Sequence, residues 1–236
     1  MKNLVDLHTH TIFSNHAYSS LTENISEAYD VGLLYYGHTD HQPDNVGVGA
    51  HRHVFVNFKE VPKQIGNMRI LNGIELNIGE DFAESVKQYT AKLDYAVASI
   101  HGYVHGFKHS KEENTNFYLE AINTPIVKIL GHIDDGQHPC DYYTVIKACK
   151  ENKVFVEINN SGLVPDSFRM NARENLKEIL RICKELKCPV IMNSDAHIRY
   201  NVGRVDLALE VLKENDFPME LVANYNIDLF KDYFNL

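Results

Sequence analysis

The chain has 236 residues, of which 44% are hydrophobic and 23% charged, and its formal net charge at pH 7 is −9. This composition is typical of a folded globular protein and excludes an intrinsically disordered chain. The negative charge and the lack of a Lys/Arg cluster argue against binding to nucleic acid. No apolar run is long enough to span a membrane, and the first residues lack the apolar core of a signal peptide, so we expect a cytoplasmic protein.

Short apolar, β-branched runs alternate with helical patterns from end to end. In chain order, strands are expected at 4–8, 33–39, 69–78, 93–101, 127–133, 154–159 and 190–194. A helix is expected after each of them. The first begins after the Ser20–Glu23 capping box, and the others lie near 54–65, 82–91, 114–122 and 141–152, after Asn171 up to Pro189, and near 204–214.

Seven βα units without a linker or repeat predict one domain, residues 1–236, of the α/β class. A TIM-like (β/α)₇ barrel fits this count better than the alternative, an open doubly wound sheet. Four cysteines without CxxC spacing, Cys140, Cys149, Cys183 and Cys188, are expected to be buried and reduced.

Residues that can bind metal follow the predicted strands. Their positions are His8 and His10, His41, Glu75, His101, His132, and Asp195 with His197. In a parallel barrel the carboxyl ends of all strands open onto one face, so we expect these side chains to converge there.

The spacing of these residues favours metal binding. Two residues apart on a strand, side chains point the same way, so His8 and His10 could share one ion, as could Asp195 and His197. A lone histidine at a strand end is more often a hydrogen-bonding loop residue than a ligand. The whole set without a cation would leave many buried polar groups unpaired, at roughly 1–3 kcal/mol each. Imidazole with carboxylate suits zinc, and also manganese or iron.

The remaining six histidines are expected at the surface or as hydrogen-bonding neighbours of the ligands, and three of them, His51, His53 and His105, could approach the substrate. The others are His38, His109 and His138. Loops at 42–53, 102–114, 134–141 and 161–171 are expected to line the pocket.

The sequence contains seven motifs in order: DLHTHTIFSNHAYSS, GHTDH, GIELNI, SIHG, GHID, EINNSG and NSDAH. Together they resemble the PHP (polymerase and histidinol phosphatase) superfamily, most closely its small stand-alone bacterial branch of phosphatases. The resemblance spans Asp6 to His197. It implies a distorted (β/α)₇ barrel with a trinuclear centre, usually of zinc.

Carried over by position, the resemblance implies three ligand sets, of which the first and second share Glu75 as a bridge. The first is His8, His10, Glu75 and Asp195; the second is Glu75, His101 and His132; the third is His16, His41 and His197. Four further residues, Asp6, Asp40, Glu157 and Asn159, are expected to hydrogen-bond the ligands or steady the strand ends.

Three cations at the open face of the barrel favour hydrolysis of a small phosphate monoester by metal-activated water. Asp195 is expected to orient the water, and a histidine near the third ion, such as His197, to protonate the leaving group. Arg169 is the first candidate for binding phosphate and Arg199 the second. Typical histidinol phosphatases have an arginine where this chain has Val164, which makes histidinol phosphate a less secure substrate.

Other functions remain open at this stage. They are a metal-dependent nuclease or exonuclease, a non-catalytic metal-binding or partner-binding module, and a hydrolase acting on another bond such as an amide. No membrane partner is expected, and the oligomeric state, including a homo-oligomer, is left open.

Overall fold

A computed structural model describes residues 2–102 and 109–236. The strands are β1 (Val5–Asp6), β2 (Tyr35–His38), β3 (Gln64–Ile65), β4 (Met68–Asn72), β5 (Glu75–Asn77), β6 (Ala96–Ser99), β7 (Val127–Leu130), β8 (Phe155–Asn159) and β9 (Val190–Asn193). The helices are α1 (Leu21–Asp30), α2 (Arg52–Asn57), α3 (Phe82–Tyr89), α5 (Lys111–Ile122), α6 (Tyr142–Asn152), α7 (Ala172–Leu186), α8 (Asp206–Glu214) and α9 (Ile227–Phe234).

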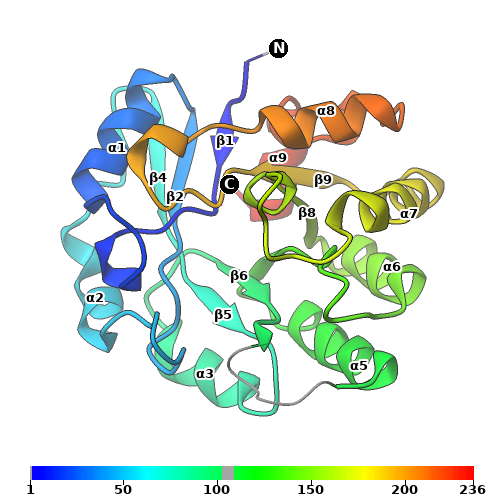
Figure 1. The fold of residues 1–236 in the computed structure, drawn as a ribbon. Helices are drawn as coiled ribbons and strands as arrows, with labels where there is room; N and C mark the ends of the chain where they lie inside the picture. The colour runs from blue at the N-terminus through cyan, green and yellow to red at the C-terminus, as the bar shows by residue number, and fades with distance from the viewer. Residues whose placement is uncertain (1, 103–108) are drawn as a thin grey trace.

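The strands lie inside a ring of helices (Figure 1). They form two sheets, β1-β2-β4-β3 and β5-β6-β7-β8-β9, in which every pair is parallel except β3 with β4. The α/β class and the parallel order are therefore confirmed. The predicted closed barrel is not, because no continuous hydrogen-bonded ladder joins the two sheets among the described residues.

The first break in the ladder falls inside the predicted strand 69–78. Gly73 ends the pairing of β4 with β2, and β5 then pairs with β6. A Cβ on Gly73 would lie 2.5 Å from the ring of Tyr95, and one on Gly37 would lie 2.1 Å from the Tyr95 hydroxyl. Tyr95 is fully buried, so these two glycines make room for its ring inside the strands.

Asparagine side chains bridge the second break, between β1 and β9. Asn193 Oδ1 accepts a hydrogen bond from Leu7 N at 2.9 Å. Asn224 donates to Val5 O and Met192 O, both at 2.8 Å, and accepts from Met192 N. Single bridges also connect the two sheets: Thr9–Ala196 lies just past the carboxyl ends of β1 and β9, and His41–Glu75 joins the segment after β2 to the first residue of β5.

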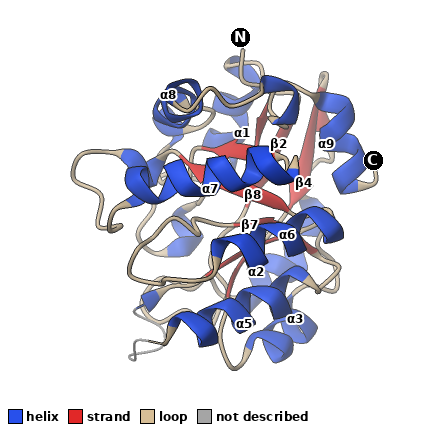
Figure 2. Cartoon of the chain, turned by 90° about the vertical axis from the view of Figure 1, so that its right-hand side faces the viewer, coloured by secondary structure: helices blue, strands red, loops and turns tan. Residues whose placement is uncertain are grey.

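The helices pack outside the strands as the apolar spacing predicts. Helices α5, α6 and α7 lie side by side in front of β7 and β8, and α8 packs beside α7 against β9 (Figure 2). The capping box of Ser20 with Glu23 opens α1, and an equivalent box of Ser110 with Glu113 starts α5 three residues before the predicted range. None of the helices in the described residues has the length and apolar character needed to cross a bilayer.

Two helix predictions need correction. The helix predicted at 54–65 ends as a 3₁₀ turn at Glu60, and Gln64–Ile65 forms β3, because Pro62 cannot continue a helix. Helix α9 was not predicted. Its Phe230 and Phe234 pack with Tyr95, Phe155 and other inward-facing strand residues.

Candidate metal centre

A cavity of about 950 Å³ opens beside the carboxyl ends of the strands. Its wall includes seven of the nine predicted ligands: His16, His41, Glu75, His101, His132, Asp195 and His197. The other two, His8 and His10, are fully buried and contact Glu75 and Asp195 from behind. All four predicted pocket loops contribute, for example through Val48, Gly102, Gln137 and Phe168. A fifth segment, 201–207, was not predicted to line it.

Glu75 lies at the middle of the nine residues. Its Oε1 is 3.3 Å from His8 Nε2, 3.3 Å from His101 Nε2 and 3.2 Å from His132 Nε2. Its Oε2 is 2.9 Å from His41 Nδ1 and 3.5 Å from His10 Nε2. One carboxylate therefore contacts five imidazoles that come from four different strand ends.

Asp195 and His197 form the opposite side of the cluster. Asp195 Oδ1 is 3.1 Å from His10 Nε2 and 3.6 Å from His8 Nε2. His197 Nε2 is 2.8 Å from His16 Nε2. The structure thus brings all nine predicted ligands together.

The donor atoms fit divalent cations. Two atoms bound to the same zinc ion at about 2.1 Å in a tetrahedron lie roughly 3.4 Å apart, close to most of the separations above. Five of these atoms are buried without a hydrogen-bond partner: His8 Nε2, His10 Nε2, His41 Nδ1, Glu75 Oε2 and Asp195 Oδ1. Unpaired buried polar atoms are costly, and a shared cation would satisfy them together.

Hydrogen bonds behind the cluster set the histidine tautomers. His8 Nδ1 donates to Glu157 Oε1 at 2.8 Å, His10 Nδ1 to Ser14 Oγ at 3.2 Å, and His197 Nδ1 to the Asp195 carbonyl at 2.9 Å. Each bond leaves the Nε2 lone pair facing the centre, as a metal ligand requires.

Glu157 and Asp40 anchor these bonds. Glu157 also accepts from His132 N, Asn159 Nδ2 and Asn193 Nδ2 at 2.9–3.0 Å. Asp40 accepts from Thr11 and from Ser14 Oγ, which frees a lone pair on Ser14 for His10. Sequence reasoning named the two carboxylates and Asn159 but missed Thr11, Ser14 and Asn193, since Ser, Thr and Asn beside a strand end carry no distinctive signal.

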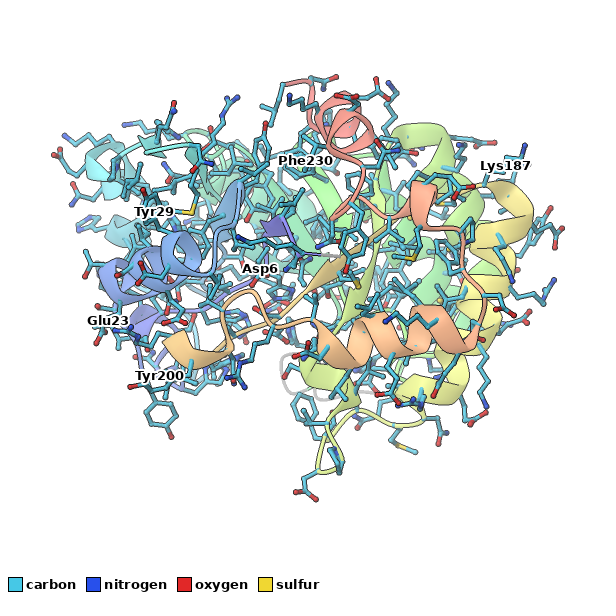
Figure 3. All side chains as sticks on the ribbon, turned by 90° about the horizontal axis from the view of Figure 1, so that it is seen from above. Asp6, Glu23, Tyr29, Lys187, Tyr200 and Phe230 are labelled. Carbon is cyan, nitrogen blue, oxygen red and sulfur yellow. The ribbon has the colours of Figure 1, made fainter. Side chains whose placement is uncertain are left out.

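Asp6 has a different role from the carboxylates that contact the histidines. It accepts from Ser194 N, Ser194 Oγ and Gly203 N, so it steadies the turn after β9. Figure 3 places it in the interior, between the labelled Tyr200 and Phe230. Burial raises its pKa to about 6, against the lowering effect of these hydrogen bonds.

The electrostatics of the cluster keep its two central carboxylates charged. Burial by itself raises the pKa of Glu75, but the imidazoles of His8 and His101 outweigh it and hold that pKa well below the usual range. Burial also raises the pKa of Asp195, but His8 and the contact with His10 lower it more, so this pKa too falls well below the usual range. Burial, with His197 and His41 nearby, lowers the pKa of His10.

The two candidate arginines lie in different surroundings. Arg169 is buried in the cavity wall, and its Nη2 donates to Asp195 Oδ2 at 2.9 Å while Nη1 has no partner. Arg199 instead pairs with Glu27 of α1 at 3.1 Å and does not line the cavity among the described residues. The geometry therefore favours Arg169 over Arg199.

The remaining histidines are dispersed. His138 lines the cavity, whereas His51 and His53 lie exposed at the start of α2. His38 is fully buried against Phe58 and Asn72, so the expectation of a surface position was wrong for it. His105 lies outside the described residues.

Known proteins share the sequence pattern of this chain. Residues 6–161, well over half of the chain, match the family model described as PHP domain. The chain belongs to the PHP family. This PHP protein is 39% identical over 238 residues to a protein of Thermoanaerobacter sp. (strain X514) named "Probable phosphatase", with 99% of this chain and 95% of the relative covered. A Clostridium botulinum (strain Langeland) protein of the same name is 38% identical over 236 residues, with coverage of 99% and 95%.

Solved structures share the fold of this PHP protein. Histidinol phosphate phosphatase from Lactococcus lactis, solved with zinc, L-histidinol and phosphate, superposes with a TM-score of 0.62 and 19% identity, covering 92% of this chain and 95% of that one. A Listeria monocytogenes protein described as a histidinol phosphatase gives 0.59 and 18%, covering 85% and 97%. At these identities the likeness concerns the fold alone.

Proposed function

We propose that this PHP protein is a metal-dependent phosphatase that hydrolyses phosphate monoesters of small molecules at a centre of three divalent ions, with zinc as the first candidate. The observation that carries the proposal is the meeting of nine donor side chains, with Glu75 at their middle and with unpaired buried atoms among them, beside a cavity. Relatives named phosphatase, at 37–39% identity over nearly the whole chain, support the same reaction class.

The proposed ligand sets are those implied by the sequence resemblance. The distances from Glu75 Oε1 to His101 and His132 support the second set, and the contact of His16 with His197 supports the third. The boundary between the first and third sets is less sharp, because donor atoms of His10, His41 and His197 also lie within 4.8 Å of one another. Manganese or iron would suit the same nitrogen and oxygen donors.

The residues of the chain have separate roles in the proposed reaction. Bound divalent ions supply Lewis acidity and lower the pKa of water. Asp195 Oδ2 is fixed by Arg169 and Asn159, so Oδ1 is held in one orientation toward the cluster. The unpaired Arg169 Nη1 would donate to a phosphate oxygen. His197 would bind the third ion through Nε2 while its Nδ1–H donates to the Asp195 carbonyl, so in place of the general-acid role predicted for it, the proton for the leaving alkoxide would come from water.

The test combines metal analysis with activity. Protein stripped of metal and reconstituted with zinc, manganese or iron would be assayed on p-nitrophenyl phosphate, a panel of phosphorylated metabolites including L-histidinol phosphate, and a short oligonucleotide. Glu75→Gln should lower the bound metal and reduce phosphatase activity by about 100-fold or more. Exposed Glu80→Gln makes the same chemical change outside the cluster and should retain both.

Two outcomes contradict the proposal. Faster cleavage of the oligonucleotide than of every monoester would favour a nuclease. Cleavage of neither substrate class by fully loaded protein would favour a binding role.

A further inference from the structure

The cavity extends well beyond the predicted metal ligands. Its volume, about 950 Å³, lies near the upper end of the roughly 300–1,000 Å³ typical of small-molecule pockets, far more than one phosphate group fills. One part of the wall outside the cluster comes from the loop after β8 and the segment before and at the start of α8. It includes Asn160, Val164, Phe168, Arg204, Asp206 and Leu207.

Arg204 is a cation of this wall whose side chain has no partner among the described residues. Within residues 2–102 and 109–236, its exposed guanidinium makes no hydrogen bond or ion pair, and only its backbone N–H is bonded, to Asn201 O. Arg169, in contrast, is buried and bound to Asp195. Arg204 therefore offers its five N–H donors to whatever enters this part of the cavity.

The backbone that carries Arg204 is held firmly. The preceding residue, Gly203, donates its N–H to buried Asp6 at 2.7 Å and accepts from Asn3 at 3.0 Å. On the other side, Asn160 Oδ1 accepts from Leu207 N and Ala208 N at 2.9 and 3.1 Å, which ties the start of α8 to the loop after β8. The base of the side chain thus has a fixed place relative to the metal cluster.

We infer that Arg204 binds a second anionic group of the substrate. The preferred substrates are then phosphate monoesters whose alcohol portion carries a carboxylate or a second phosphate, because a guanidinium recognises either through paired hydrogen bonds. The inference rests on the proposed phosphatase function for the position of the first phosphate. Asp206 lines the same wall and opposes the second anion, so its removal should strengthen this interaction.

Phosphonates test the inference without turnover, since their C–P bond is not a phosphate ester. Binding of alkylphosphonates and ω-phosphonocarboxylates of matched length, from short to long chains, would be measured by calorimetry on zinc-reconstituted protein. The carboxylate should tighten binding by about fivefold at the best chain length. A parallel series of alkane bisphosphonates distinguishes a second phosphate from a carboxylate.

Variants assign the preference to one side chain. Arg204→Gln should abolish the preference for the carboxylate, Arg204→Lys should keep part of it, and Asp206→Asn should increase it. Arg69→Gln, an identical charge change at an exposed position on β4, should leave it unchanged. Equal binding of matched compounds at every length, or a preference that persists in Arg204→Gln, would overturn the inference.

A separate measurement, the release of phosphate, tests the phosphatase proposal. Glycerol 3-phosphate and 3-phosphoglycerate would be incubated with the same protein and released phosphate measured. A carboxylate preference that depends on Arg204, without hydrolysis of either ester or of the metabolite panel, would retain the anion subsite and reject the phosphatase.

Discussion

Glu157→Gln tests whether the hydrogen bonds behind the cluster hold the metal ligands. Each Glu157 oxygen accepts two hydrogen bonds: Oε1 from His8 Nδ1 and Asn193 Nδ2, and Oε2 from His132 N and Asn159 Nδ2. Glutamine must place its NH₂ group at one of these positions. In either orientation a donor then faces two donors, and two hydrogen bonds are lost.

The expected size follows from that count. Hydrogen bonds to a charged group contribute about 1.5–3 kcal/mol each, so losing two should lower the free energy of unfolding of the metal-loaded protein by about 3 kcal/mol or more. Since His8 would also lose its orienting partner, zinc affinity should fall by about 10–100-fold. In chelator the destabilisation should persist, because burial and Asp195 raise the pKa of Glu157 but the contact with His8 holds it below its usual value.

Urea unfolding followed by circular dichroism, with and without chelator, measures the stability change, and competition with a chromogenic chelator measures zinc affinity. Glu151→Gln is the matched control, because it makes the same change on the exposed end of α6. If Glu157→Gln bound zinc within twofold of the unaltered protein and unfolded like Glu151→Gln, the reasoning would be refuted.

Three further outcomes are expected. Zinc at 100 times its dissociation constant should raise the free energy of unfolding by about 2.7 kcal/mol per site in urea titrations, whereas no change would argue against a native metal site. Gly162→Ala should raise KM for phosphate monoesters, because the added Cβ would lie 2.7 Å from Arg169 Nη1. Steady-state kinetics should show the higher KM, and thermal unfolding should show an unchanged Tm. All four cysteines are buried, and burial raises the pKa of Cys140 to about 12, so Ellman's reagent should label none before denaturant is added.

The parallel strands were predictable because nearly all of their residues are buried on both faces. β8 is buried throughout from Phe155 to Asn159, and its sequence is apolar except for Glu157 and Asn159, whose side chains hydrogen-bond His8 and Asp195. The breaks between the sheets were not predictable in the same way. They depend on Gly73 meeting Tyr95, and on Asn224 reaching back to β1, contacts between residues far apart along the chain.

Helix α9 had a readable signal that the sequence reasoning overlooked. Asn226 caps it by accepting from Leu229 N, and Ile227, Phe230 and Phe234 follow at helical spacing. The error at 54–65 has the opposite origin, since an apolar helical pattern was extended past Pro62.

The convergence of eight of the nine donors could be predicted because strand direction alone brings the carboxyl ends together, whereas His16 was named only through the family resemblance. The backbone that aims them could not. His132 and Asp195 have φ of 29° and 52°, a left-handed region that residues other than glycine seldom adopt and that costs about 1–3 kcal/mol each. Both directly contact the central cluster, and Glu157 accepts the His132 N–H while Asn159 and Arg169 bind the Asp195 carboxylate. Hydrogen bonds from β8 and the loop after it therefore hold two strained residues in place, and a metal bound to them would add to that restraint.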